Sequence, residues 1–112
     1  MKDTKLLKGT LHTIILKLLS ETNRMYGYEI TQQVRHLTAG EFILTEGALY
    51  PALHKLEADG LLDTAIEVVD GRARKYYSLT EKGKKAQVSK MKDALTFVEK
   101  LQIILNSKPI IS

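Results

Sequence analysis

The chain has 112 residues, and its 44% hydrophobic and 27% charged residues are typical of a folded globular domain, which excludes a disordered chain. A formal net charge of +4 and a pI near 9.3 are a mild basic excess that only slightly favours a nucleic-acid partner. The lack of cysteine excludes disulfides and thiolate metal sites, and no stretch reaches the ~18 apolar residues of a membrane span. We therefore expect one soluble, cytoplasmic domain that covers residues 1–112.

The first part of the chain predicts two amphipathic helices. Apolar residues in residues 4–21 recur at i, i+4, i+7 and i+8, which predicts one continuous helix. A break at residues 22–24 precedes a second helix over residues 27–38, and Ala39-Gly40 ends it because glycine is preferred just past a helix end. We expect Tyr26 and Tyr28 to pack the second helix against the first, or to offer their hydroxyls to phosphate.

A short connection over residues 41–44, with room for one strand pairing, leads to a third helix. Thr45 is a good N-cap for this helix. Leu49, Leu53 and Leu56 follow at i, i+4 and i+7, so one stripe of the helix faces a core. The opposite face is short, polar and small enough to enter a groove, and it carries Gly47, Pro51, His54 and Ala58, with Tyr50 at its edge.

A basic hairpin is predicted directly after this helix. Asp70-Gly71 lies between the β-prone residues 61–69 and 72–77, which is a strong signal for a tight turn between two strands. Three basic residues with no acid between them follow the turn: Arg72, Arg74 and Lys75. A groove-fitting helix beside a basic hairpin is the layout of a winged helix-turn-helix, so we predict a mainly α (α+β) fold with the DNA-binding region in residues 4–79.

A long last helix is predicted over residues 80–106, with Thr80 as its cap. No later segment exists to cover its broad apolar stripe, and in so small a chain a second copy is the expected partner. The stripe contains Met91, Ala94, Leu95, Phe97, Val98, Leu101, Ile104 and Leu105.

Several motifs of the chain resemble one family, the PadR-like transcriptional regulators, in the short form with a single C-terminal helix. They are Leu7-Lys-Gly-Thr-Leu11, Tyr26-Gly-Tyr-Glu-Ile30, the block over residues 47–57 with its specific Leu-Tyr-Pro-Ala-Leu, and residues 74–83. The resemblance covers about residues 7–86. It implies a dimeric repressor that binds an inverted repeat in a promoter. It also implies dimerisation through the first and last helices, and release from DNA by small aromatic or drug-like compounds.

Two features depart from the pattern of that family. Its usual Ser/Thr-Pro at the start of the DNA-reading helix is Thr45-Glu46 here, which places a carboxylate near the expected phosphate. The chain also has no tryptophan, so ligand stacking on an interface tryptophan cannot be carried over.

The candidate DNA-binding residues come from the third helix and the hairpin. A helix N-terminus suits phosphate, but a Thr there is also a plain cap, and a Tyr there serves phosphate binding or packing equally well. Side chains further along the helix can reach base edges, whereas those of the hairpin suit phosphate or the minor groove, or are merely solvated. The residues are Thr45, Gly47, Tyr50, Pro51, His54, Lys55, Arg72, Arg74 and Lys75.

The last helix suggests a second site. Met91, Ala94 and Phe97 either bind a small aromatic effector at the dimer interface or form a closed apolar contact. No catalytic, metal or cofactor motif is present, so no enzyme is expected. We predict a sequence-specific DNA-binding regulator, acting as a homodimeric repressor. The alternative is a winged-helix module for protein–protein contacts without DNA binding.

Overall fold

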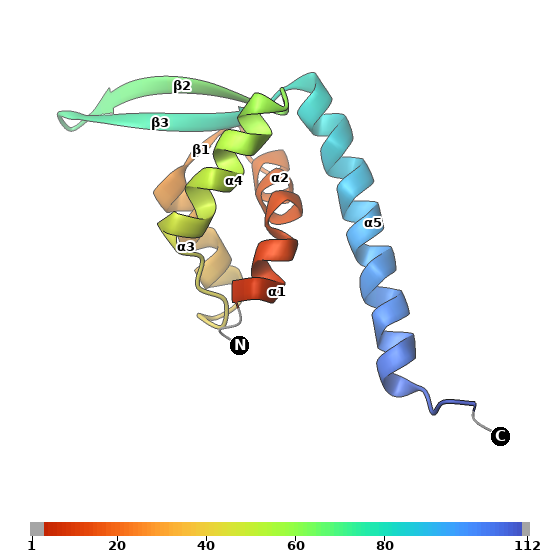
Figure 1. Cartoon of the computed structure of the whole chain (residues 1–112). Helices are drawn as coiled ribbons and strands as arrows, with labels where there is room; N and C mark the ends of the chain where they lie inside the picture. Colours follow the sequence, from red (N-terminus) through yellow and green to blue (C-terminus); the bar gives the residue numbers. More distant parts are fainter. Residues whose placement is uncertain (1–3, 111–112) are drawn as a thin grey trace.

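The computed structural model describes residues 4–110 of the chain. Figure 1 shows a small sheet and a group of helices gathered together, while the far end of the last helix runs away from them. In chain order the elements of the described residues are α1 (Thr4–Gly9), α2 (Leu11–Ser20), β1 (Met25–Tyr26), α3 (Gly27–Leu37), α4 (Glu46–Ala58), β2 (Leu62–Val69), β3 (Arg72–Leu79) and α5 (Glu81–Asn106).

The prediction of one helix over residues 4–21 is wrong, because α1 ends at Gly9 and α2 begins at Leu11. Thr10 between them has φ −112° and ψ 4° and is not helical. Its hydroxyl donates to the carbonyl of Leu7 at 3.0 Å, which offers the backbone an alternative to the helical ladder, and Gly9 adds a residue of low helix propensity. The apolar periodicity continues across the break, since Leu7 and Leu11 are both buried.

The three strands form an antiparallel sheet in the order β1-β3-β2. The predicted hairpin is confirmed, and Asp70 and Gly71 both have positive φ (51° and 76°), as a type I′ turn requires. The strand pairing considered for residues 41–44 is not found. The third strand is β1, whose Met25 and Tyr26 pair with Tyr77 and Tyr76 of β3.

The core lies between α2, α3, α4 and the base of the hairpin. The predicted stripe of α4 is confirmed, because Leu49, Leu53 and Leu56 are all fully buried. Full burial of one such side chain stabilises a fold by about 1.5–3 kcal/mol. This packing leaves the opposite face of α4 outside. The other fully buried side chains are Leu11, Ile15, Leu16, Leu19, Ile30 and Tyr77.

The start of α5 is fixed to the turn that follows α4. The Thr80 hydroxyl accepts a hydrogen bond from the Gly83 N–H at 2.9 Å and donates to the Gly60 carbonyl at 2.7 Å. Gly83 lies so close to Leu61 that a Cβ atom built on it would be 2.0 Å from the Leu61 carbonyl oxygen. The first part of α5 packs against α2, with Ala86 against the core, and the rest of the helix extends away, which gives the chain its 68 × 30 × 21 Å shape.

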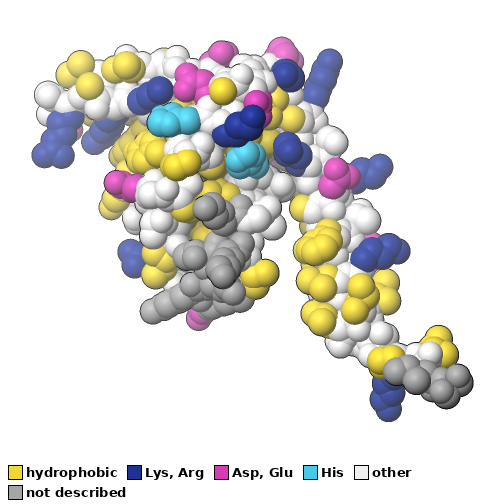
Figure 2. Space-filling model, viewed as in Figure 1, with side chains coloured by type: hydrophobic (Ala, Val, Ile, Leu, Met, Phe, Trp, Pro, Cys, Tyr) yellow, Lys and Arg dark blue, Asp and Glu magenta, His cyan; other side chains and the backbone are white. Residues whose placement is uncertain are grey.

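The predicted apolar stripe of α5 is exposed in the single chain, and Gly83 is the one buried residue of the helix. Figure 2 shows hydrophobic side chains gathered along its second half. The largest exposed ones are Val88, Leu95, Phe97, Val98, Leu101, Ile103, Ile104 and Leu105.

Candidate nucleic-acid interface

Helix α4 presents the small, polar face that the sequence predicts. Thr45 is its N-cap, and the Thr45 hydroxyl accepts a hydrogen bond from the Ala48 N–H at 3.3 Å. Gly47, Pro51 and His54 are all exposed, on the side of the helix away from the buried leucines. An exposed helix start with free N–H groups suits a phosphate, and a narrow exposed face suits a groove.

Tyr50 packs against the start of α3. Its hydroxyl lies over Gly27, where a Cβ atom would meet the Tyr50 oxygen at 2.5 Å, and 37% of Tyr50 remains exposed. The tyrosine therefore locks α4 onto α3 while part of it stays accessible. The contact between Tyr50 and Gly27 was not predicted from the sequence, although a glycine between two tyrosines is a signal for close packing.

Lys55 is exposed and pairs with Asp59 one turn along the same helix, at 3.1 Å between Lys55 Nζ and Asp59 Oδ1. Exposed pairs with this spacing are worth only about 0.3–0.5 kcal/mol. The ammonium group is therefore available to an incoming anion. His54 is exposed beside it.

The three basic residues of the hairpin do not form one cluster. Side chains alternate along a strand, so Arg72 and Arg74 share one face of β3 and Lys75 lies on the other. Lys75 points toward α4, with its Nζ atom 3.6 Å from Glu57 Oε1. Within the part of the chain that the structure describes, Arg72 and Arg74 form no ion pair, so their charges remain unneutralised.

The face of Arg72 and Arg74 carries a group of aromatic and charged residues that the sequence analysis missed. Tyr26 meets Tyr76 of β3 edge to face, with ring centroids 5.5 Å apart, a contact that the sequence did not predict. The Arg24 guanidinium lies 4.0 Å above the Tyr76 ring, and that of Arg74 lies 4.7 Å from the Tyr26 ring. We call these four residues the arginine–tyrosine strip. Tyr28 stacks on Tyr26 at 6.5 Å and is exposed.

Arg24 also forms a bidentate ion pair with Glu67 of β2, at 2.6 and 2.8 Å. Hydrogen bonding to the guanidinium lowers the pKa of the Glu67 carboxyl, and the same bond raises the pKa of Arg24. Both groups are therefore charged at neutral pH. Arg72, Arg74 and Tyr76 stand at every second position of the sequence, and this spacing was the available signal that they share one face of β3.

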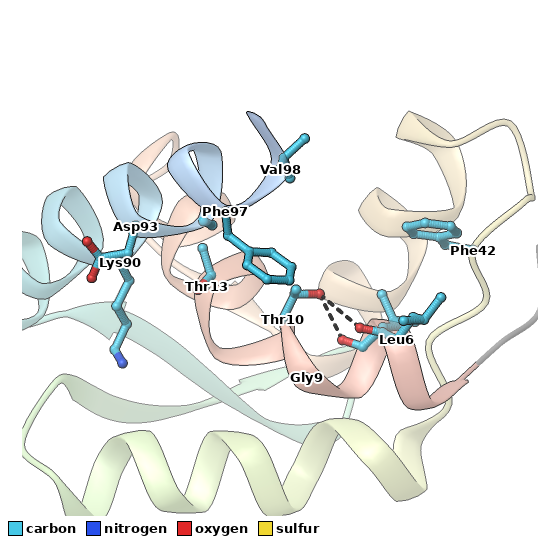
Figure 3. A pocket seen from close by; sticks show the side chains of 11 residues that line it. Leu6, Gly9, Thr10, Thr13, Phe42, Lys90, Asp93, Phe97 and Val98 are labelled. Carbon is cyan, nitrogen blue, oxygen red and sulfur yellow. Dashed lines mark hydrogen bonds between the residues drawn. The ribbon is translucent and has the colours of Figure 1, made fainter. Parts of the chain in front are cut away.

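The predicted effector residues divide between two hollows. Ala94 and Phe97 line a cavity of about 730 Å³ between α5 and the α1–α2 corner, with Lys90 and Asp93 on the same helix. Figure 3 shows the Phe97 ring projecting from α5 toward this corner. Met91 lines a separate hollow of the single chain with Val88 and Leu95, and the grouping of Met91 with Ala94 and Phe97 as an effector site stays a prediction.

None of the helices in residues 4–110 is long and apolar enough to cross a membrane. In the same residues, no three His, Asp or Glu side chains lie close enough together to hold a metal ion.

The fold is that of a winged helix: α3 and α4 form a helix-turn-helix, β2 and β3 form the wing, and a long terminal helix follows. Over residues 15–88 the chain matches the transcriptional regulator PadR-like family, and it belongs to that family. A transcriptional regulator of Mycobacterium tuberculosis is 45% identical over 64 residues, which cover 57% of each chain. An uncharacterised protein of Lysinibacillus sphaericus is 38% identical over 85 residues, which cover 75% of this chain and 77% of that protein.

Solved structures support the same assignment along nearly the whole chain. A transcriptional regulator from Clostridium thermocellum superposes with a TM-score of 0.81 at 29% identity, covering 92% of this chain and 99% of that one. A PadR family regulator from Eggerthella lenta superposes with a TM-score of 0.77 at 25% identity, covering 94% of this chain and 89% of that one. The protein is therefore a transcriptional regulator of the PadR-like family.

Proposed function

We propose that this regulator is a repressor that binds an inverted-repeat DNA operator as a homodimer. The observation that carries the proposal is the exposed face of α4, with Gly47, Pro51 and His54, next to a wing whose Arg72 and Arg74 have no acidic partner among residues 4–110. Helix α4 would enter a major groove, and the wing would reach the adjacent backbone or minor groove. The N-terminal end of α4, at Thr45, would face a phosphate, with Glu46 in its first turn opposing that contact.

Dimerisation is proposed through α5, with a contribution from α1. The second half of α5 exposes a row of large apolar side chains that nothing in the single chain covers. Exposed apolar surface of this extent marks an interaction site, and a two-fold dimer would place two α4 helices on one palindrome. The half-sites would then lie about one helical turn apart, or a multiple of it. Sedimentation equilibrium showing a monomer at micromolar concentration would contradict this part.

The cavity lined by Ala94 and Phe97 supports a second candidate function, the binding of a small apolar or aromatic effector that releases DNA. In the dimer this cavity would lie near the interface, where a closed apolar contact is the competing use. A thermal-shift screen with phenolic and cationic drug-like compounds tests it. No change in melting temperature with any compound would favour the closed interface.

The alternative of a protein–protein module without DNA binding is less well supported. Such a module has no need of two arginines without acidic partners on the wing, and their unneutralised charge suits phosphate. A cytoplasmic location remains a prediction.

The main experiment is a fluorescence-anisotropy titration of the protein against the promoter DNA upstream of its own gene and against a scrambled duplex, at low and physiological salt. We expect tighter binding to the promoter and affinity that falls steeply with salt, because phosphate contacts release counterions. Equal weak binding to both duplexes would mean that the operator lies elsewhere. No binding at low salt would refute the proposed function and favour the protein–protein module.

A further inference from the structure

The arginine–tyrosine strip connects the wing to the recognition helix. Tyr26 directly precedes Gly27, and the Tyr50 hydroxyl of α4 lies over that glycine. Tyr26 in turn contacts Tyr76 and Arg74, and Tyr76 contacts Arg24. Figure 2 shows basic side chains along the wing with hydrophobic side chains between the wing and the helices. The strip lies on the face of β3 that also carries Arg72, so it adjoins the wing cations that are proposed to contact DNA.

The two cations of the strip differ in charge balance. Arg74 lies over a ring and has no carboxylate partner among the described residues. Arg24 is held on a ring and by both oxygens of Glu67, so its charge is balanced. The Glu67 carboxylate would repel a phosphate at this surface. It also occupies the edge of the Arg24 guanidinium that a phosphate would use.

The exchange of Glu67 for a phosphate is energetically feasible. The side chains of Arg24 and Glu67 are 41% and 45% exposed. Exposed ion pairs contribute about 0–1 kcal/mol, so little is lost when the pair opens. The planar guanidinium binds phosphate in the same two-point geometry as a carboxylate, and its stacking on Tyr76 keeps it oriented.

We propose that Arg24 is a further ligand for the DNA backbone and that Glu67 holds it back, so that Glu67 limits the affinity and salt dependence of DNA binding. This inference rests on the proposed DNA-binding function. It assigns a role to two residues outside the recognition helix and the basic part of the wing. The partner is a phosphate of duplex DNA, and its contact with Arg24 carries no base specificity.

Glu67→Gln tests the inference directly. The probe is a fluorescein-labelled 30-base-pair duplex of mixed sequence, titrated by anisotropy between 50 and 200 mM salt. We expect tighter binding than wild type at low salt, and a log–log salt slope steeper by about 0.9, the value for one more phosphate contact. Over that fourfold salt change the variant would lose about 3.5-fold more affinity than wild type.

Glu21→Gln is the matched control, because it removes the same charge from an exposed ion pair with Lys17 that involves no residue of the strip. It should leave the slope at the wild-type value. In the double variant Arg24→Gln/Glu67→Gln the slope should return to wild type, since the freed cation is absent. Thermal unfolding of each variant checks that the fold is kept.

The outcomes distinguish a failure of this inference from a failure of the proposed DNA-binding function. If wild type binds DNA and both Glu67→Gln and Glu21→Gln keep its salt slope, the proposed role of Arg24 and Glu67 is overturned, while the DNA-binding function stands. A steeper slope that persists in the double variant would also overturn it, because Arg24 would not be the source. Failure of all the proteins to bind at 50 mM salt would refute the DNA-binding function, and this inference with it.

Discussion

The junction between α5 and the rest of the fold gives a prediction whose size can be worked from the structure. Replacing Gly83 by alanine puts a Cβ atom 2.0 Å from the Leu61 carbonyl oxygen and 3.0 Å from its carbon. An ordinary contact needs at least 3.4 Å, so α5 must move away from the turn by about 1.4 Å. The obstructing atoms belong to the backbone, so no side-chain rotation can relieve the clash.

The expected cost follows from two opposing terms. Overpacking of this kind costs about 1–3 kcal/mol, and alanine recovers about 1 kcal/mol through its better helix propensity. A rigid backbone contact belongs at the upper end of the overpacking cost, so the net loss in the free energy of unfolding is about 2 kcal/mol. For a domain of this size that loss lowers the melting temperature by roughly 10 °C.

The assay is thermal unfolding followed by far-ultraviolet circular dichroism, at one fixed protein concentration because a dimer's stability depends on it. Gly9→Ala is the matched control, since a Cβ atom on Gly9 at the end of α1 meets nothing within 4 Å. It should be neutral or slightly stabilising. If Gly83→Ala unfolds at the same temperature as Gly9→Ala, the junction yields freely and the steric reasoning is refuted.

Three further predictions concern α4, the wing and α2. Tyr50→Ala and Arg74→Ala should each weaken DNA binding in a gel-shift titration while the wing stays folded, and unchanged affinity in both would refute the site assignment. Gly27→Ala should displace the Tyr50 side chain with only a small change in stability, because the new Cβ meets the flexible Tyr50 oxygen at 2.5 Å, and Tyr50→Ala in the same chain should remove that change in a denaturation curve. Burial first, and Lys90 second, lower the pKa of His12 below its usual 6.5. The unfolded chain therefore takes up a proton more readily, so stability should fall as pH drops through 6.5. His12→Gln should flatten this dependence between pH 7.5 and 5.5, and an unaltered dependence would contradict it.

Local sequence signals predicted the elements that depend on local chemistry. Thr45 and Thr80 cap their helices as expected, and Asp70-Gly71 makes the predicted turn. The strand β1 could not be predicted, because a two-residue strand has no periodicity and exists only through its pairing with β3. The break at Thr10 was missed for another reason, since the apolar pattern passes through it unbroken.

The candidate site was predicted in its residues more than in its geometry. Gly47, Pro51 and His54 lie together as expected because one helix positions them. The prediction grouped the three hairpin cations as one cluster. Side chains alternate along a strand, and this alternation separates Lys75 from Arg74. The contact between Arg24 and Glu67 joins residues 43 positions apart, and no local pattern announces it.

The same junction that Gly83 makes tight also links the proposed recognition helix to the proposed dimerisation helix. The Thr80 N–H donates to the Leu61 carbonyl at 3.1 Å, and the Lys82 ammonium donates to the Asp59 carbonyl at 2.9 Å, at the end of α4. A change in the angle of α5 is therefore transmitted to α4 through hydrogen bonds and not through a flexible linker. In a two-fold dimer that angle sets the separation of the two α4 helices. Gly83→Ala, studied below its melting temperature, should thus weaken binding to a palindrome more than to a single half-site. An equal loss on both would show that the junction does not set the geometry of the dimer.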